Sequence, residues 1–492
     1  MEATHLPRAK AGRAGGAETL VYAGLVLAML LVVATAVAGF HPAIALAAVT
    51  AALVLAAAHR FLFAWTTLLG AVVFLMLFIP VKRYTLAGIG LEPLRVMTAL
   101  VVLALVSSAL VQPEVRARSG MGLPIAAIGG AIVLSEFTNY GRITGGGLRS
   151  DVLLSVLGFV AYFAAFWLVC VALRSRSHID NLLMAVVIGA AAIGVSAVIE
   201  SRTRYNPFDH LQQYIPILHF SGVPYVPDRG GGARAYASGQ HPIAFGAALV
   251  MLIPIAVYLY RRSGRHLWWL AIAGLALGAL ATRSRTGIVM LVIELIVYLI
   301  LKRRETVRLL PYLIPVVLAA HVAVPGTLGS ITDAFSPNGG IVKSEQNAGA
   351  EWHSNYGVGR IGEWTPALKE WERTPIFGQG FGTRVTDLKS PTFNAPILDD
   401  QWLGVLLELG VVGVAALIWF FRRIIVRMSR MSHRVGEDDS WLAVGLAASI
   451  AAYAFGMFTF DAFAFVQVTL LMFILVGAAC AFERPGMAER LP

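Results

Sequence analysis

Residues 267–301 read LWWLAIAGLALGALATRSRTGIVMLVIELIVYLIL, two apolar blocks separated by a short polar stretch that holds two arginines. A helix needs about 20 apolar residues to cross the hydrocarbon core of a bilayer. Backbone N–H and C=O groups that face lipid have no water to bond, so apolar blocks near this length must fold as helices. The stretch therefore predicts two membrane-spanning helices joined by a tight polar turn.

The same alternation runs through the whole chain. Of its 492 residues, 58% are hydrophobic and 14% are charged, and the mean hydropathy is +0.73. A soluble domain is usually about half apolar and about a quarter charged. This composition predicts an all-α polytopic membrane protein with about 14 (12–14) transmembrane helices. The expected spans are 20–40, 43–58, 61–81, 94–111, 121–138, 151–173, 180–200, 241–260, 267–282, 286–301, 309–324, 400–421, 441–460 and 462–482.

The spans and the long loops between them divide the chain into parts. The first apolar block has full length and others follow it at once, which favours a membrane span over a cleaved signal peptide. The expected parts are a cytoplasmic N-terminal tail (1–19), a transmembrane bundle (20–324) with an outer loop (201–240), a long extracytoplasmic loop (325–399), C-terminal transmembrane helices (400–482) and a cytoplasmic tail (483–492).

Lys and Arg are concentrated in every second connection between the spans. Short cytoplasmic loops carry an excess of these residues, and this excess sets the orientation of a membrane protein. The net charge of +11 is therefore mainly a topology signal, and no nucleic-acid-binding motif accompanies it. We expect a multi-pass protein of the cytoplasmic (inner) membrane with both termini in the cytoplasm. The basic connections lie at Arg116/Arg118, Arg174/Arg176, 261–265, 302–304 and 422–434.

Two cysteines, Cys170 and Cys480, fall within apolar spans. Buried cysteines usually behave as small hydrophobic residues. We therefore expect no disulfide, metal site or catalytic role from them.

The long outer loop contains a helical pattern. Loops longer than about 12–15 residues in a compact protein are usually either functional or disordered. Trp364, Leu368 and Trp371 follow a helical spacing, which predicts a helix at 361–373 with one apolar side. Because tryptophan favours the membrane–water boundary, this helix either lies flat on the outer interface or packs on the bundle as a lid. Both arrangements place it over the same outer region.

Arg283 and Arg285 lie in the tight turn between two spans, on a connection that faces outward, against the general distribution of positive charge. Their guanidinium groups either extend to lipid phosphates or form a site for an anion, because a guanidinium matches two phosphate oxygens at once. Arg234, just before a span, and Arg360, just before the loop helix, could reach the same place. A cluster of arginines at membrane level suits a lipid-linked phosphate or pyrophosphate.

Two carboxylates lie inside expected spans. Glu294 is midway along 286–301, and Glu408 is within a turn or two of the loop boundary. A charge inside the bilayer is costly and is a functional hypothesis by default. The structural alternative for both residues is pairing with a polar group on a neighbouring helix.

Four pieces of sequence, in their order around the long loop, resemble the O-antigen ligase and polymerase superfamily of polytopic glycosyltransferases. The resemblance covers roughly residues 230–420, and the number of expected spans agrees with it. The pieces are Arg234 with Ala237–Pro242, which contains His241; Ser284–Gly287; Arg360–Trp364 with Pro375–Gly380, which contains Gly378 and Gly380; and Asp399–Leu403 with Glu408–Gly410 and Gly413.

The resemblance implies an enzyme. Members of the superfamily transfer glycans from a polyisoprenyl (undecaprenyl) pyrophosphate carrier to a glycan or lipid acceptor on the outer face of the cytoplasmic membrane. The transfer inverts the anomeric carbon and needs no metal ion or other cofactor. It serves the synthesis of surface polysaccharide, O-antigen or exopolysaccharide, with polysaccharide assembly or export proteins as expected partners. Arg234 and Arg285, assisted by Arg283 and Arg360, would offset the charge that develops on the departing pyrophosphate.

A general base has to take the proton of the acceptor hydroxyl. Where the ligases carry His-Asn before the last long spans, this chain carries Asp399 and Asp400, which looks more like the exopolysaccharide polymerases of the superfamily. This departure favours chain polymerisation over attachment to lipid A. Asp399 is assigned the role of base and His353 is held in reserve. Asp400 either shares that role or caps the following helix, and His241 is expected to order the turn before Pro242.

The main alternative is a transporter or flippase for a lipid-linked or anionic substrate. Many spans and the intramembrane Glu294 would also suit such a protein. Transporters often contain repeated halves and midplane sites on broken helices. The chain has no clear internal repeat, and its polar groups collect outside the membrane, so the enzyme is the favoured hypothesis. A non-catalytic scaffold would leave the outer arginines unexplained.

Overall fold

The structure, a computed structural model, describes residues 64–88, 90–111, 119–222, 228, 233–309, 311, 364–386, 390–395 and 397–488. The chain divides into two compact units, Met1–Leu68 and Leu69–Pro492, and the second contains the fold and the site discussed here. The predicted spans 20–40 and 43–58 and nearly all of 309–324 lie outside the described residues. The expected number of about 14 spans therefore stays a prediction.

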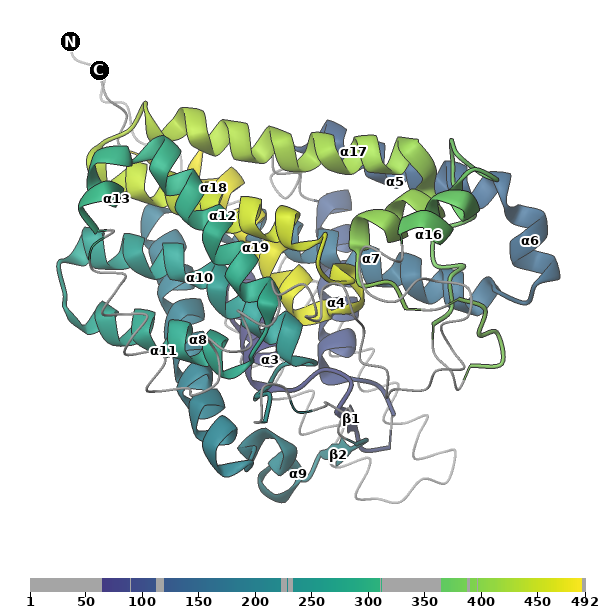
Figure 1. The fold of residues 1–492 in the computed structure, drawn as a ribbon, viewed down its shortest axis with the longest axis horizontal. Coiled ribbons are helices and arrows are strands. Elements are labelled where there is room, and N and C mark those ends of the chain that lie inside the picture. The colour runs from purple at the N-terminus through teal and green to yellow at the C-terminus, as the bar shows by residue number, and fades with distance from the viewer. Residues whose placement is uncertain are drawn as a thin grey trace, which may run out of the picture. The chain divides into compact units, whose positions relative to one another are not determined.

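The described elements are almost all helices (Figure 1). Every predicted span that falls within the described residues coincides with a helix, which confirms a polytopic all-α architecture. Six helices are long and apolar enough to cross a membrane, and four shorter ones are also apolar. The elements are α3 (Trp65–Phe78), β1 (Tyr84–Leu86), α4 (Pro93–Val111), α5 (Gly122–Thr138), α6 (Tyr140–Gly145), α7 (Arg149–Ala172), α8 (Arg176–Thr203), η2 (Pro207–Asp209), α9 (Leu211–Tyr214), β2 (Leu218–Phe220), α10 (Pro242–Ser263), α11 (Leu267–Ala281), α12 (Arg285–Leu301), α13 (Arg303–Leu309), α16 (Trp364–Trp371), α17 (Gln401–Ser432), α18 (Glu437–Gly456), η4 (Ala462–Ala464) and α19 (Val466–Phe482).

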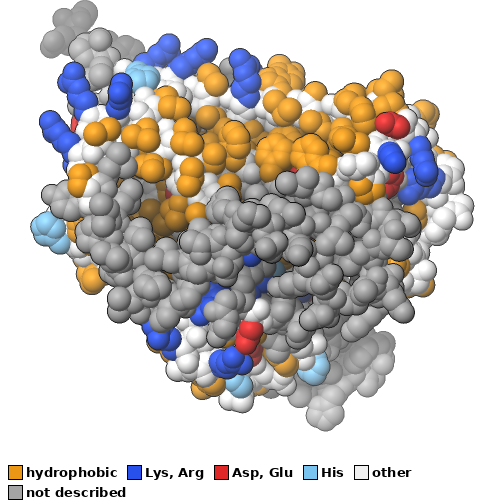
Figure 2. All heavy atoms as spheres, in the orientation of Figure 1, with side chains coloured by type: hydrophobic (Ala, Val, Ile, Leu, Met, Phe, Trp, Pro, Cys, Tyr) orange, Lys and Arg blue, Asp and Glu red, His pale blue; other side chains and the backbone are white. Residues whose placement is uncertain are grey.

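The helices differ sharply in how much of their surface the protein covers. In the most apolar 18-residue stretch of α18, 94% of the residues are buried, whereas in that of α4 only 28% are buried. Large hydrophobic side chains such as Leu103, Leu110 and Phe137 are exposed on the outer helices. Figure 2 shows hydrophobic side chains spread over the face around α17, with Lys and Arg gathered toward the α13 end. An exposed apolar surface of this extent is what a bilayer requires.

At one end of the bundle, loops that the sequence assigns to the cytoplasm contact one another. Arg176, at the start of α8, pairs with Asp439 at 2.7 Å, and Lys302, after α12, pairs with Glu437 at 3.0 Å. The opposite end gathers the loops expected outside, where β1 pairs antiparallel with β2. These contacts agree with helices that run up and down in alternation. Which end faces the cytoplasm stays a prediction from the distribution of positive charge.

Helix α17 is broken where the sequence predicted an ordinary span at 400–421. Gly410 has φ 63° and ψ −164°, far from helical values, and the helix continues beyond it to Ser432. The end of the long outer loop inserts at this break: Gln379 N–H donates to the Leu407 carbonyl at 2.9 Å, and Gly380 N–H donates to the Glu408 carbonyl at 3.2 Å. The loop thus satisfies the backbone groups that the break leaves open, as irregular backbone at membrane depth requires.

Helix α16 confirms the helix predicted at 361–373 over the residues that the structure describes there. Ala367 is fully buried and packs with Leu403 and Leu407 of α17, while Trp364 and Leu368 are exposed. The helix therefore packs on the bundle through one side. Its other side leaves Trp364 and Leu368 available to the outer interface. Packing on the bundle and contact with the interface are therefore compatible.

Gly410 gives a test of the broken helix. A Cβ atom there would lie 2.3 Å from the Ile376 carbonyl oxygen, in a backbone conformation that only glycine adopts readily. We expect Gly410→Ala to cost roughly 3 kcal/mol of stability, measured as a lower melting temperature in detergent. Gly130→Ala in α5, where nothing lies within 4 Å of the added carbon, is the control and should melt like the wild type. Equal melting of all three proteins would contradict the observed break.

Candidate functional site

The predicted turn between α11 and α12 is tight and buried. Helix α11 ends at Ala281, Arg283 takes a left-handed conformation with φ 50°, and α12 begins at Arg285. The Thr282 hydroxyl accepts from the Ser284 N–H at 3.2 Å and donates back to the Ala279 carbonyl at 2.7 Å. A left-handed backbone is unfavourable for a residue with a side chain and tends to persist at functional sites.

The structure brings Arg234 to this turn although about fifty residues separate them. The Ala235 N–H donates to the Ala281 carbonyl at 3.1 Å, and the Arg234 Nε donates to the Thr282 carbonyl at 3.4 Å. Arg234 and Arg283 are both more than nine-tenths buried. The expectation that these arginines lie together is met for Arg234 and the Thr282–Arg285 turn.

Charged side chains act on Arg283 at this turn. Burial, the largest effect, and the neighbouring charge of Arg202 lower the pKa of Arg283, while Asp228 raises it. Asp228 also forms a 2.8 Å ion pair with Arg204. We call Arg202, Arg204, Arg234, Arg283 and Arg285 the arginine cluster. Arg234 and Arg283 are buried, whereas Arg202 and Arg204 are exposed. Several guanidinium groups in one region favour an anion with several oxygen acceptors, such as a phosphate or pyrophosphate.

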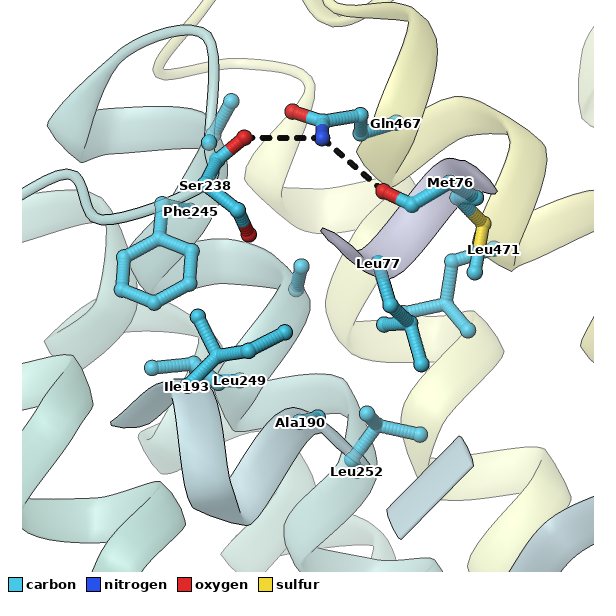
Figure 3. A pocket seen from close by; sticks show the side chains of 13 residues that line it. Met76, Leu77, Ala190, Ile193, Ser238, Phe245, Leu249, Leu252, Gln467 and Leu471 are labelled. Carbon is cyan, nitrogen blue, oxygen red and sulfur yellow. Dashed lines mark hydrogen bonds between the residues drawn. The ribbon is translucent and has the colours of Figure 1, made fainter. Parts of the chain in front are cut away.

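A small apolar cavity lies beside the segment that leads from Arg234 to α10 (Figure 3). Its walls come from α3, α8, α10 and α19, and include Leu77, Ile193 and Leu249. At its polar edge Gln467 donates to the carbonyls of Ser238 (3.0 Å) and Met76 (2.9 Å). The apolar cavity therefore lies directly beside the segment that carries Arg234.

Acidic residues gather at the start of α17. Asp400 is buried and caps the helix, because its carboxylate accepts from the N–H groups of Trp402 (2.9 Å) and Leu403 (3.2 Å). This geometry confirms the capping role considered for Asp400. Asp399 is exposed and lies within electrostatic reach of Asp461, which precedes η4. Burial raises the pKa of Asp461 to about 6, and this value includes a lowering by Lys82 and a smaller rise from Asp399.

The corner between α18 and α19 links the arginine cluster to these carboxylates. On one side, the Thr459 hydroxyl donates to the Thr286 hydroxyl at 3.0 Å, next to Arg285. On the other side, Gln401 N–H donates to the Met457 carbonyl at 2.8 Å, and Gln401 accepts from the Phe463 N–H at 2.6 Å. One short corner thus contacts the first turn of α12 and the first residue of α17.

The end of the long loop is fastened by charged side chains. Glu408, beside the break in α17, accepts from the N–H groups of Gly382 (3.1 Å) and Arg384 (3.4 Å). Arg384 pairs with Glu370 of α16 at 2.6 Å. Gly378, Gly380 and Gly382 all have positive φ, as expected for a glycine-rich turn. Glu408 therefore bonds the backbone of the loop. The structural alternative predicted pairing with a neighbouring helix instead.

The structure describes two of the remaining predicted residues, His241 and Glu294. His241 caps α10, accepting from the Ile243 N–H at 3.2 Å, which confirms its predicted ordering role. Glu294 is buried in α12, and neither carboxylate oxygen has a hydrogen-bond partner among the described residues, so the pairing expected for it is not found there. His353 and Arg360 lie outside the described residues. Within those residues, no group of three or more His, Cys, Asp or Glu side chains is placed to hold a metal ion.

Three residues of this region were not predicted from the sequence. Arg83, Gln467 and Asp461 all contact or face segments that carry predicted residues. Arg83 had a usable signal, because it lies on a connection expected outside, like Arg283 and Arg285. Gln467 and Asp461 had none, since a polar residue near the end of a span is common.

Comparison with known proteins supports the interpretation of this region. Residues 269–418 match the family model described as O-antigen ligase, which confirms the resemblance to the O-antigen ligase and polymerase superfamily. The matched segment includes the Thr282–Arg285 turn, α16 and the break in α17. The chain matches no curated protein.

Asp461 predicts a pH-dependent stability. Because its pKa is raised from 3.8 to about 6 in the folded protein, its contribution is fully present below pH 3.8 and is lost as the pH rises through about 6. We expect Asp461→Asn to melt at least about 2 °C higher than the wild type at about pH 7.5, and alike at about pH 3. The exposed Asp438→Asn is the control and should show no such divergence. A wild-type-like pH profile for Asp461→Asn would refute the burial of a titrating carboxyl at this corner.

Proposed function

We propose that this protein is a membrane glycosyltransferase that transfers a glycan from a polyisoprenyl pyrophosphate donor to a glycan acceptor at the outer face of the cytoplasmic membrane. The observation that carries the proposal is the meeting of Arg234 with the Thr282–Arg285 turn inside a membrane-embedded helical bundle. The family match over the same turn supports this reaction class. Polymerisation is favoured over ligation, because Asp399 and Asp400 stand where the ligases carry His-Asn.

The arginine cluster would bind the pyrophosphate of the donor. A pyrophosphate offers several anionic oxygens, and Arg234 and Arg283 are desolvated cations at one turn. Electrostatic attraction is stronger in such partly buried surroundings than in water. The exposed apolar side chains of the outer helices would contact the hydrocarbon of the donor, which supports a lipid-linked rather than a water-soluble substrate.

The reaction is then a single displacement at the anomeric carbon. The acceptor oxygen forms a bond to this carbon from the face opposite the pyrophosphate, and its proton passes to a carboxylate. The bond between the anomeric carbon and the pyrophosphate oxygen breaks, and its electron pair leaves with the polyisoprenyl pyrophosphate. The extra negative charge on that group is offset by the guanidinium groups, so the arginines stabilise the transition state more than the ground state. Inversion follows from the geometry of attack, and no metal ion is invoked.

Asp399 is the proposed general base. It is exposed and it precedes the capped end of α17. Asp400 is committed to the helix cap and is a poorer candidate. The α18–α19 corner, which contacts both α12 and α17, would hold base and arginines in a constant relation during transfer.

Loss of a guanidinium tests the donor site. We expect Arg285→Ala and Arg234→Ala to reduce the surface polysaccharide of cells lacking the native protein by about 100-fold, as for removal of one charge-stabilising group. Arg95→Gln is the matched control, because Arg95 is exposed and pairs only with Glu92 at 3.2 Å among the ion pairs of the described residues. Membrane levels of each variant are compared by immunoblotting.

The same variants separate the enzyme from a flippase. In vesicles that contain the purified protein and a polyisoprenyl-pyrophosphate glycan, the proposal requires new glycosidic bonds and release of the lipid pyrophosphate. Donor that crosses the bilayer without new bonds would establish the transporter instead. Unchanged polysaccharide in cells with Arg285→Ala would reject the arginine cluster as the donor site.

The two aspartates allow an isosteric test of the base. Asparagine caps helices about as well as aspartate does but cannot accept a proton. We expect Asp400→Asn to retain most of the activity and Asp399→Asn to lose about 100-fold or more in turnover number, measured in the vesicle assay. A larger loss of turnover in Asp400→Asn than in Asp399→Asn would assign the role of base to Asp400. Full activity of both variants would exclude both aspartates as the base.

A further inference from the structure

A buried turn separates Arg234 from α10. It comprises residues 236–240, and Ala237 within it is fully buried with φ 41°. This left-handed conformation is unfavourable for alanine by an amount that shifts an equilibrium roughly 5- to 30-fold. The turn therefore needs external contacts to hold its shape. Its shape matters because it joins Arg234 on one side to His241, the cap of α10, on the other.

Arg83, which lies 154 residues before Ala237 in the sequence, supplies these contacts. Its guanidinium donates to the carbonyl of Ala237 and, at 3.0 Å, to the carbonyl of Gly239. The same group pairs with Asp209 at 2.5 Å and lies over the Tyr236 ring at 4.9 Å from its centre. A planar fork of donors can satisfy such a set of acceptors, which a single ammonium group cannot.

Two further side chains hold the turn from other directions. The Glu200 carboxylate accepts from the N–H groups of Ala237 (2.7 Å) and Tyr236 (3.3 Å). Asn206 donates from its side-chain amide to the Ala237 carbonyl at 3.0 Å. Arg83, Glu200 and Asn206 thus surround the one strained residue of the segment.

Arg83 is poorly placed to bind a substrate itself. Only 1% of its surface is exposed, and its two terminal nitrogens are engaged with Asp209 and with the turn. Any effect of Arg83 on an anion must therefore pass through the backbone of residues 236–240 to Arg234.

We propose that Arg83 is a positioning residue for the pyrophosphate site: by holding Ala237 in its left-handed conformation, it keeps Arg234 at the Thr282–Arg285 turn. The inference rests on the proposed function for the identity of the anion, but the positioning itself does not. Without Arg83, the turn relaxes and only a fraction of the molecules present Arg234 correctly. The apparent affinity for the anion falls by that fraction.

The experiment measures binding of inorganic pyrophosphate to the full-length protein in nanodiscs, together with amide hydrogen exchange of residues 235–240. We expect Arg83→Gln to weaken pyrophosphate binding roughly 5- to 30-fold and to speed exchange in this segment. Glycine adopts positive φ at little cost, so adding Ala237→Gly to Arg83→Gln should restore most of the affinity. A purely Coulombic or global effect of Arg83 would not be restored in this way.

Tyr84→Phe is the matched control. The Tyr84 hydroxyl bonds the Phe208 carbonyl at 2.9 Å and the Leu211 N–H at 3.0 Å, so it holds the same outer loop as Arg83 does but does not touch the turn. We expect it to lower the melting temperature and to leave the pyrophosphate affinity unchanged.

The outcomes are distinguishable. Unchanged affinity in Arg83→Gln, an equal loss in Tyr84→Phe, or no restoration by Ala237→Gly would each overturn the positioning role. If the wild type binds no pyrophosphate, the proposed donor site fails. The exchange measurement then still decides whether Arg83 holds the turn, because it needs no ligand.

Discussion

Backbone groups that cannot reach water must be bonded within the protein, and this constraint organises the whole structure. It makes the apolar blocks helical, and it limits irregular backbone to places where another segment supplies partners. The break in α17 at Gly410 is such a place, because the loop backbone at Gln379 and Gly380 bonds the carbonyls that the helix leaves open. The turn at Ala237 is another, where side chains replace the missing helical partners. The turn at Ala237 lies three residues after Arg234, which the proposed reaction uses.

A second constraint is the cost of burying positive charge. Arg234 and Arg283 are almost fully buried, and Arg202 adds like charge to Arg283. Burying such groups costs desolvation energy. In the proposed donor site, an anion with several oxygens would offset this cost, and the more negative leaving group would offset more of it.

The sequence predicted the helices well because apolar length is a property of each segment alone. It also placed Arg234 and Arg360 near the turn of Arg283 and Arg285, and the structure brings Arg234 to the Thr282 carbonyl of that turn, while Arg360 lies outside the described residues. It did not predict the break at Gly410 or the role of Arg83. The partners of Arg83 lie 126 to 156 residues away and those of the break lie in the preceding loop, so no local sequence pattern indicates either contact. The capping of α17 by Asp400 was an open alternative, because the same residue type serves as cap and as base; only the bond to Trp402 N–H decides it.

The α18–α19 corner explains how distant segments can act in one reaction. Thr459 bonds α12 beside Arg285, and Met457 bonds the first residue of α17 beside Asp399. Because α18 is the most deeply buried of the long apolar helices within the described residues, its end is a rigid reference for both. In the proposed reaction, a base on the loop side and arginines on the bundle side would therefore keep a fixed separation during transfer.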